Sequence, residues 1–149
     1  MRDIFVIDHS VFIDALTEKG DSEYQESSRE LIKHLFRYKI SGINIAYMPA
    51  EALDKLFRYF LLLGKLHSIS MISNIVAMDS TTFRDKNLNL SIPEAMTRLA
   101  YKFTLSPSKV YLITNNKRVY GSLLEDNTIF SVFDSKRAGD IITHPNFLA

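Results

Sequence analysis

A carboxylate and a hydroxyl follow the apolar run near the N-terminus. Residues 4–7 are all apolar, Asp8 comes next, and Ser10 stands two residues further on. Polar side chains also follow later apolar runs, at Asp79, Asn115, Asn116 and Asp134. Carboxylate and amide oxygens brought together are the ligands of hard cations such as Mg²⁺ or Mn²⁺. Such an ion orients a water molecule and neutralises charge that develops on a phosphodiester.

The same residues also have structural interpretations that need no ligand. Asp8 or Ser10 could cap a helix over residues 11–16, because these side chains accept a backbone N–H at a helix start. Ser91 and Glu94 fit a capping box, in which each side chain satisfies the other's backbone N–H. The pair Asn115–Asn116 fits a turn or a helix cap. Both interpretations stay open at this point.

Length and composition predict one domain over residues 1–149. The chain is 46% hydrophobic, which suits a single core at this size. No apolar run approaches the roughly 20 residues of a membrane span, and the N-terminus is too acidic for a secretion signal, so we expect a cytoplasmic protein with no membrane partner. The sequence has no cysteine, which excludes disulfides and thiolate metal sites.

The charge balance limits how the chain could bind nucleic acid. A formal net charge of +1 excludes binding by bulk electrostatics, so any nucleic-acid site must be local. Arg29, Lys33 and Arg37 recur at helical spacing, a pattern that is typical of a solvated helix face.

Short apolar runs alternate with helix-like segments along the chain. The runs predict strands over residues 4–7, 43–47, 74–78, 109–114 and 128–133. Apolar residues three and four apart predict helices within 18–42, 50–66 and 91–103, with helical or loop segments over 67–73 and 115–127 and a polar loop over 79–89. This alternation predicts an α/β fold, a three-layer α/β/α domain with a central parallel sheet and right-handed crossovers. The polar residues that end parallel strands then share one edge of the sheet.

Several common catalytic patterns are missing from the sequence. It has no Gly-x-Gly-x-x-Gly or P-loop glycine pattern, which argues against nucleotide binding of those kinds. It has no Gly-x-Ser-x-Gly elbow of a serine hydrolase. A phosphotransferase of the haloacid dehalogenase type would need a second aspartate where Ser10 stands.

Four segments, taken in order, resemble the motifs of PIN domains, a family of small metal-dependent ribonucleases that includes the VapC-type toxins. These segments are VIDHSVF, LSIPEAMTRLA, VYLITNN and the closing IITHPNFL. The resemblance spans nearly the whole chain. It implies a sheet of about five strands in the order 3-2-1-4-5, a Mg²⁺- or Mn²⁺-dependent endoribonuclease activity, and RNA as the substrate.

The resemblance assigns roles to several residues. Asp8 and Ser10 match the first motif, which makes Asp8 the central metal-binding carboxylate. Glu94 matches the family's third acid, so the metal ligands implied are Asp8 and Glu94. Thr114 matches the threonine of the late motif, and Asn116 stands where the family has an aspartate. The implied strand order would place Asp8 beside Thr114 and Asn116.

Two family acids are missing from this chain. In the segment LDKL, Lys55 takes the place of the second acid, and Arg118 takes a position that is acidic in some members. Glu51 lies one turn before Lys55 on the same helix face, and Asp54 is adjacent, so either acid could substitute if the site were shifted. Asn116 still offers an oxygen but no charge.

Two functional hypotheses follow. In the first, the chain is an endoribonuclease that binds one cation at Asp8 and Glu94, because two cations would need more carboxylates. In the second, it is a catalytically degenerate PIN-like domain that binds RNA or a protein, with Lys55 and Arg118 pairing with the acids in place of metal. An antitoxin-like protein would fit as a partner. A second copy of the chain would fit as well, because residues 59–66 carry more apolar surface than one helix face needs.

Overall fold

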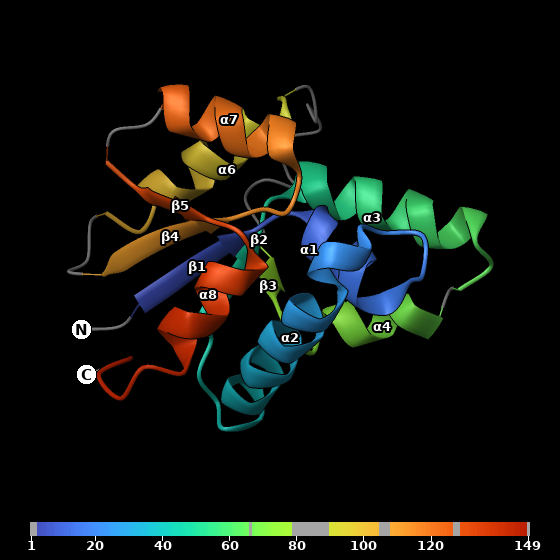
Figure 1. Cartoon of the computed structure of the whole chain (residues 1–149), viewed down its shortest axis with the longest axis horizontal. Helices are drawn as coiled ribbons and strands as arrows, with labels where there is room; N and C mark the ends of the chain where they lie inside the picture. Colours follow the sequence, from blue (N-terminus) through green and yellow to red (C-terminus); the bar gives the residue numbers. More distant parts are fainter. Residues whose placement is uncertain (1–2, 66, 79–89, 105–107, 127–128, 149) are drawn as a thin grey trace.

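The computed structural model describes residues 3–65, 67–78, 90–104, 108–126 and 129–148 (Figure 1). Its strands are β1 (Asp3–Ile7), β2 (Ala46–Met48), β3 (Ala77–Met78), β4 (Lys109–Ile113) and β5 (Ser131–Phe133). Its helices are α1 (His9–Leu16), the 3-10 helix η1 (Ser22–Tyr24), α2 (Gln25–Ile40), α3 (Ala50–Leu62), α4 (His67–Ile72), α6 (Ile92–Tyr101), α7 (Lys117–Asp126) and α8 (Ser135–Ile142). Within these ranges, no helix is long and apolar enough to cross a membrane. The expected loop over 79–89, with Asp79, lies outside the described residues.

The strands form a parallel sheet in the order β3-β2-β1-β4-β5. β1 lies at its centre, where Val6 pairs with Tyr47 of β2 and with Leu112 of β4. The prediction of an α/β domain with a parallel sheet is confirmed.

The expectation of about five full strands is corrected. β1, β2, β4 and β5 have three to five residues each, whereas β3 adds only two residues at the edge beside β2. The segment 74–78 was expected to be a strand throughout, but its first half closes the end of α4. The backbone N–H groups of Ile75 and Val76 both donate to the carbonyl of Ile72, so they are not available to a neighbouring strand.

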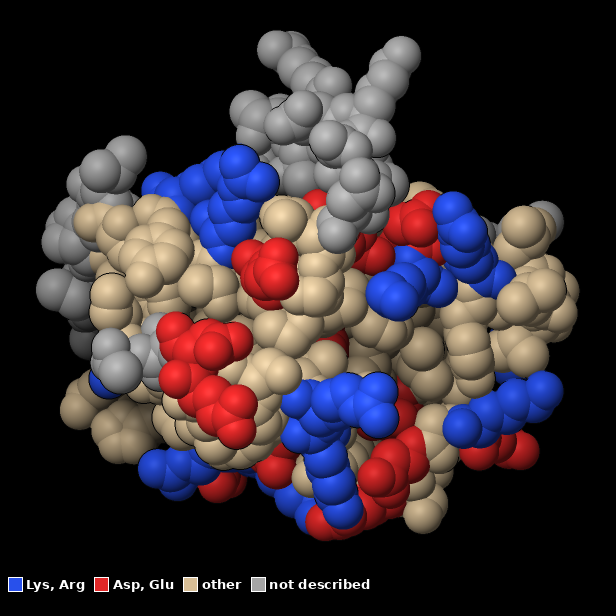
Figure 2. Space-filling model, turned by 90° about the horizontal axis from the view of Figure 1, so that it is seen from above, with Lys and Arg blue, Asp and Glu red and all other residues tan. Residues whose placement is uncertain are grey.

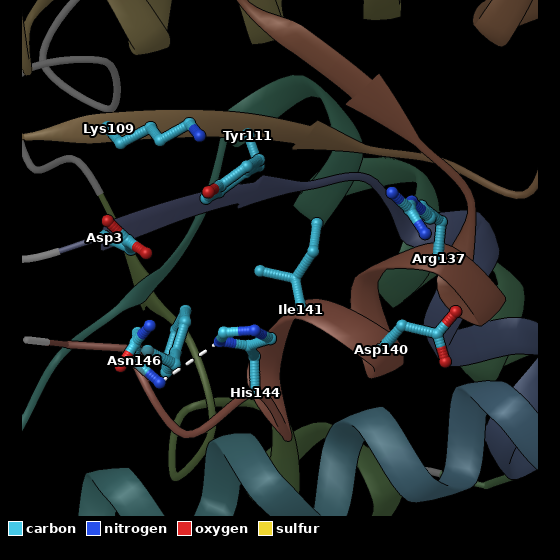
Figure 3. Close-up of a pocket in the computed structure, with 9 residues that line it drawn as sticks. Asp3, Lys109, Tyr111, Arg137, Asp140, Ile141, His144 and Asn146 are labelled. Carbon is cyan, nitrogen blue, oxygen red and sulfur yellow. Dashed lines mark hydrogen bonds between the residues drawn. The ribbon is translucent and has the colours of Figure 1, made fainter.

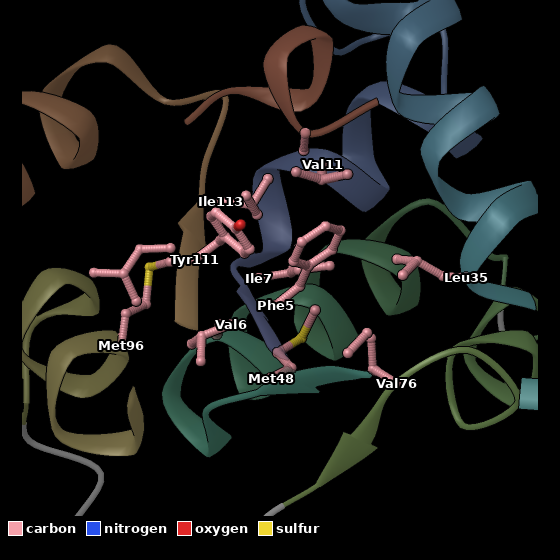
Figure 4. Close-up of a cluster of buried hydrophobic side chains, with 14 of the residues drawn as sticks. Phe5, Val6, Ile7, Val11, Leu35, Met48, Val76, Met96, Tyr111 and Ile113 are labelled. Atoms are coloured by element: carbon pink, nitrogen blue, oxygen red, sulfur yellow. The ribbon is translucent and has the colours of Figure 1, made fainter. Parts of the chain in front are cut away.

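Helices lie on both sides of this sheet. In Figure 1, α6 and α7 lie on one side, and α1, α2 and α8 lie on the other. Successive residues of β1 point to opposite sides, as in any strand. Val6 lies on the side of Met96 from α6, while Phe5 lies on the side of Leu35 from α2 (Figure 4). Because both faces are covered, the fully buried strand shows no polar alternation.

Two elements, β2 and α8, differ from the sequence-based expectation. The second strand was expected over 43–47 and is found at Ala46–Met48. The N–H of Ile43 instead donates to the carbonyl of Tyr38 at 2.9 Å, and Gly42 takes a φ of +81°, so this part of the segment closes the end of α2. α8 was not anticipated, and it packs against α2.

Candidate functional site

The end of β1 carries the most deeply buried carboxylate of the site, that of Asp8. Its backbone N–H still donates to the carbonyl of Ile113 in β4, at 3.2 Å. Its side chain accepts the backbone N–H of Ser10 at 3.1 Å and so caps α1. The capping interpretation of Asp8 is therefore correct, but it accounts for only one of the contacts that this carboxylate makes.

Two hydroxyl groups complete what we call the Asp8 cluster, made of Asp8, Ser10 and Thr114. The Ser10 hydroxyl donates to Oδ1 of Asp8 at 2.5 Å, and the Thr114 hydroxyl donates to Oδ2 at 2.6 Å. Thr114 comes from the end of β4, so the cluster joins two neighbouring strands. Burial raises the pKa of the Asp8 carboxyl, while the charge of His9 and the hydrogen bonds from Ser10 and Thr114 lower it.

The same hydroxyls also hold the chain that leaves β4. The oxygen of Ser10 accepts the backbone N–H of Asn115 at 2.9 Å, and the oxygen of Thr114 accepts that of Asn116 at 3.1 Å. Both hydroxyl protons are already given to Asp8, so the 3.4 Å approach between Ser10 and Thr114 is a contact and not a further strong bond. The expected proximity of Asp8 to Thr114 is found, whereas Asn116 contacts the cluster through its backbone N–H.

The two neighbouring asparagines have different environments. Asn116 is exposed, and its side-chain oxygen accepts the backbone N–H groups of Arg118 and Val119 at 3.0 and 3.1 Å, which caps the start of α7. This oxygen has no lone pair left for a metal ion. Asn115 is buried, and its amide connects α1, α2 and α8 through Asp14, Ser28 and Ser135.

Glu51 is a second buried carboxylate at this edge. It lies in the first turn of α3, directly after β2, and α3 packs against α1. Among the described residues, its Oε2 and the Nδ1 of His9 are buried side-chain atoms without a hydrogen-bond partner. Burial lowers the pKa of His9, the charge of Asp8 raises it, and the charge of Lys55, one turn after Glu51, lowers it further. Because the charge of Lys55 acts on His9 and α3 packs against α1, the Glu51–Lys55 face of α3 lies near the start of α1.

The other candidate acids lie in more open positions. Asp54 pairs with Arg58 at 3.1 Å in an exposed ion pair of α3. Glu94 is exposed in the first turn of α6, and its backbone N–H donates to the Ser91 hydroxyl at 3.4 Å, so this half of the expected capping box is present. Glu94 lines a hollow of about 300 Å³ between α6 and α7, which shares no residue with the Asp8 cluster. Its pairing with Asp8 on one metal ion stays a prediction.

Donor groups for a cation are few at this edge. In the part of the chain that the structure describes, no group of three or more histidine, aspartate or glutamate side chains is arranged to hold a metal ion. Asp8 already accepts three hydrogen bonds, which leaves about one lone pair on its carboxylate. Together with the unpartnered oxygen of Glu51, the edge offers two carboxylate ligands from the protein.

The surface charges do not gather into one patch of a single sign on the face that carries α6 and α7. On that face, Lys and Arg side chains alternate with Asp and Glu side chains (Figure 2). A hollow of about 460 Å³ between α8 and the starts of β1 and β4 is similarly balanced, with Lys109 and Arg137 against Asp3 and Asp140 (Figure 3). It lies at the end of the strands opposite to Asp8.

The carboxyl edge thus combines a buried, hydroxyl-bound carboxylate with a second buried acid. No family model, no curated protein and no solved structure matches this chain. The carboxyl edge leaves about one lone pair of Asp8 and one oxygen of Glu51 open to a ligand, whereas the hydroxyl protons of Ser10 and Thr114 are already donated to Asp8.

Proposed function

We propose that the chain is a divalent-metal-dependent endoribonuclease of the PIN-like kind, acting in the cytoplasm on single-stranded or structured RNA. One observation carries the proposal: two acids, Asp8 and Glu51, are buried at the carboxyl ends of adjacent parallel strands, and Glu51 keeps an unpartnered oxygen. A buried, unpaired carboxylate oxygen is costly unless something binds it. A cation is the partner that suits two carboxylates.

The donor set fits one ion and not two. Mg²⁺ takes six oxygens, usually one or two of them from carboxylates, and it keeps several waters. Asp8 and Glu51 supply two such oxygens. The PIN resemblance adds Glu94, which would join from the exposed start of α6. A second ion would lack ligands, because Asn116 uses its side-chain oxygen to cap α7.

In this proposal the bound ion and the side chains around it have different roles. A bound Mg²⁺ or Mn²⁺ would polarise a phosphodiester oxygen and lower the pKa of a water molecule. Ser10 and Thr114 orient the Asp8 carboxylate, since both donate to it. Burial of Asp8 excludes bulk water from one side of the site.

The test combines metal binding with RNA cleavage. Mn²⁺ is titrated by calorimetry into the wild type, Asp8→Asn and Glu51→Gln, and the same samples are incubated with single-stranded RNA. Asp54→Asn is the matched control, because it removes an exposed acid from the same helix as Glu51. We expect binding and cleavage in the wild type and control, and neither in the two site variants. Cleavage that persists in Asp8→Asn, or absence of Mn²⁺ heat from the wild type at millimolar concentration, would contradict the proposal.

A second candidate function is a degenerate PIN-like module that binds RNA or a protein. The observation that favours it is the exposure of Lys55 and Arg118, two cations that stand where the resemblance has acids. Leu61 and Leu62 at the end of α3 are also exposed, by 61% and 87%, and would suit an antitoxin-like protein or a second copy of the chain. RNA binding without Mn²⁺ heat or cleavage would select this candidate.

A further inference from the structure

A small hollow adjoins the Asp8 cluster on the side of α7. Its volume is about 120 Å³, and it is lined by Tyr24, Thr114, Asn115, Lys117, Tyr120 and Asp134. Thr114 belongs to both the hollow and the Asp8 cluster, so anything bound in the hollow would lie next to that cluster. The walls come from η1, the ends of β4 and β5, and the first turn of α7.

The walls combine aromatic rings, an acceptor and a cation. Tyr24 is buried, and the ammonium of Lys136 lies 5.1 Å from the centre of its ring. Burial and, next, the charge of Asp134 raise the pKa of the Tyr24 hydroxyl. Tyr120 is half-buried. Lys117 is exposed and belongs to none of the ion pairs found among the described residues.

Only some of these groups are free to recognise a ligand. The amide of Asn115 already donates to Asp14 and Ser28 and accepts from Ser135, so it serves as a wall. The Asp134 carboxylate accepts the backbone N–H of Arg137 at 3.0 Å, which leaves lone pairs for a further N–H donor.

We propose that this hollow is a subsite for one unpaired base of the RNA, with the base against Tyr120, an N–H of its edge on Asp134, and the adjoining phosphate near Lys117. The inference rests on the proposed function, because it supposes that RNA reaches the Asp8 cluster. The volume of about 120 Å³ equals that of about four water molecules, which leaves room for one small planar ring. Bases of single-stranded RNA stack on aromatic side chains and are read by hydrogen bonds to their edges.

The test measures RNA binding without metal, so that cleavage does not enter. A short labelled single-stranded RNA is titrated in EDTA with the wild type, Tyr120→Leu and Tyr120→Phe, and the fold of each variant is checked by circular dichroism. Loss of a stacked base weakens binding about 5- to 150-fold, which we expect for Tyr120→Leu. Tyr120→Phe keeps the ring and should keep the wild-type affinity.

A salt series tests the phosphate contact. Lys117→Met should make the slope of log K against log salt less steep by about 0.7, the effect of one phosphate contact on a single strand. Lys109→Met, in the remote hollow of Figure 3, is the matched control and should leave the slope unchanged.

Three results would overturn the subsite. The wild type could fail to bind single-stranded RNA in EDTA, or it could bind duplex RNA equally well. The third is a folded Tyr120→Leu variant that binds as the wild type does. The nuclease proposal fails separately, through the Mn²⁺ and cleavage assays, because a sensitivity to Tyr120 in EDTA does not depend on them.

Discussion

The buried amide of Asn115 should be one of the largest single contributors to stability among the polar side chains at the carboxyl edge. It donates to Asp14 Oδ2 at 2.9 Å and to Ser28 Oγ at 2.8 Å, and it accepts the backbone N–H of Ser135 at 2.9 Å. These three bonds connect the end of β4 to α1, α2 and α8. Asn115→Ala would remove them together and leave their partners buried.

The size of this effect can be worked out from the bonds. The two bonds to neutral partners contribute about 1 kcal/mol each, and the bond to the carboxylate contributes about 1.5 to 3 kcal/mol. We therefore expect Asn115→Ala to lower the free energy of unfolding by about 3 to 5 kcal/mol. In a chain of this length, such a loss lowers the melting temperature by roughly 6 to 20 °C.

Urea denaturation and thermal melting measure this loss, and the neighbouring residue supplies the control. Asn116→Ala removes only the exposed cap of α7, which should cost about 1 kcal/mol. If the two substitutions cost the same, the reasoning from the Asn115 network is refuted.

Two further predictions concern Asp14 and the glycines. A Cβ added at Gly20 would lie 2.7 Å from the Cα of Asp14, so Gly20→Ala should lower the free energy of unfolding by about 1 to 3 kcal/mol in urea denaturation. Gly121 lies in the middle of α7 with open space around it, so Gly121→Ala should raise the free energy of unfolding by about 0.5 to 1 kcal/mol. Burial raises the pKa of Asp14 above 3.8, so the folded state holds its proton to a higher pH than the unfolded state does. Relative to Asp14→Asn, the wild type should therefore lose stability as the pH rises from 3.8 through the raised pKa, and a gain over that range would contradict this reasoning.

The sheet could be predicted from the sequence where the strands are buried on both faces. β1 and β4 are continuous apolar runs, and both lie where they were expected. The edge of the sheet was harder to predict, because Ile75 and Val76 are apolar and β-branched like strand residues although their N–H groups close α4. α8 was missed because it has only eight residues, so the helical spacing of its apolar residues Ala138, Ile141 and Ile142 covers little more than one turn.

The sequence predicted part of the site, and the rest depended on which side chains are buried in the fold. The order of the motifs placed Asp8 beside Thr114, and the structure joins them by a hydrogen bond. Spacing alone could not choose between Glu51 and Asp54 as the acid that replaces the one missing at Lys55, because both lie within about one turn of it. The Glu51 side chain is buried whereas Asp54 pairs with Arg58 in an exposed ion pair, so burial separates the two.

Capping α1 does not by itself explain the surroundings of Asp8. Asparagine and serine cap helices about as well as aspartate does, without a charge and without burial. Here the carboxylate is fully buried, and it also accepts a hydrogen bond from the hydroxyl of Thr114, which follows another strand. The cap needs no such bond. Ionised aspartate in this place is disfavoured by burial and only partly compensated by its hydrogen bonds. The burial of Asp8 and its bond from Thr114 therefore go beyond what a helix cap requires.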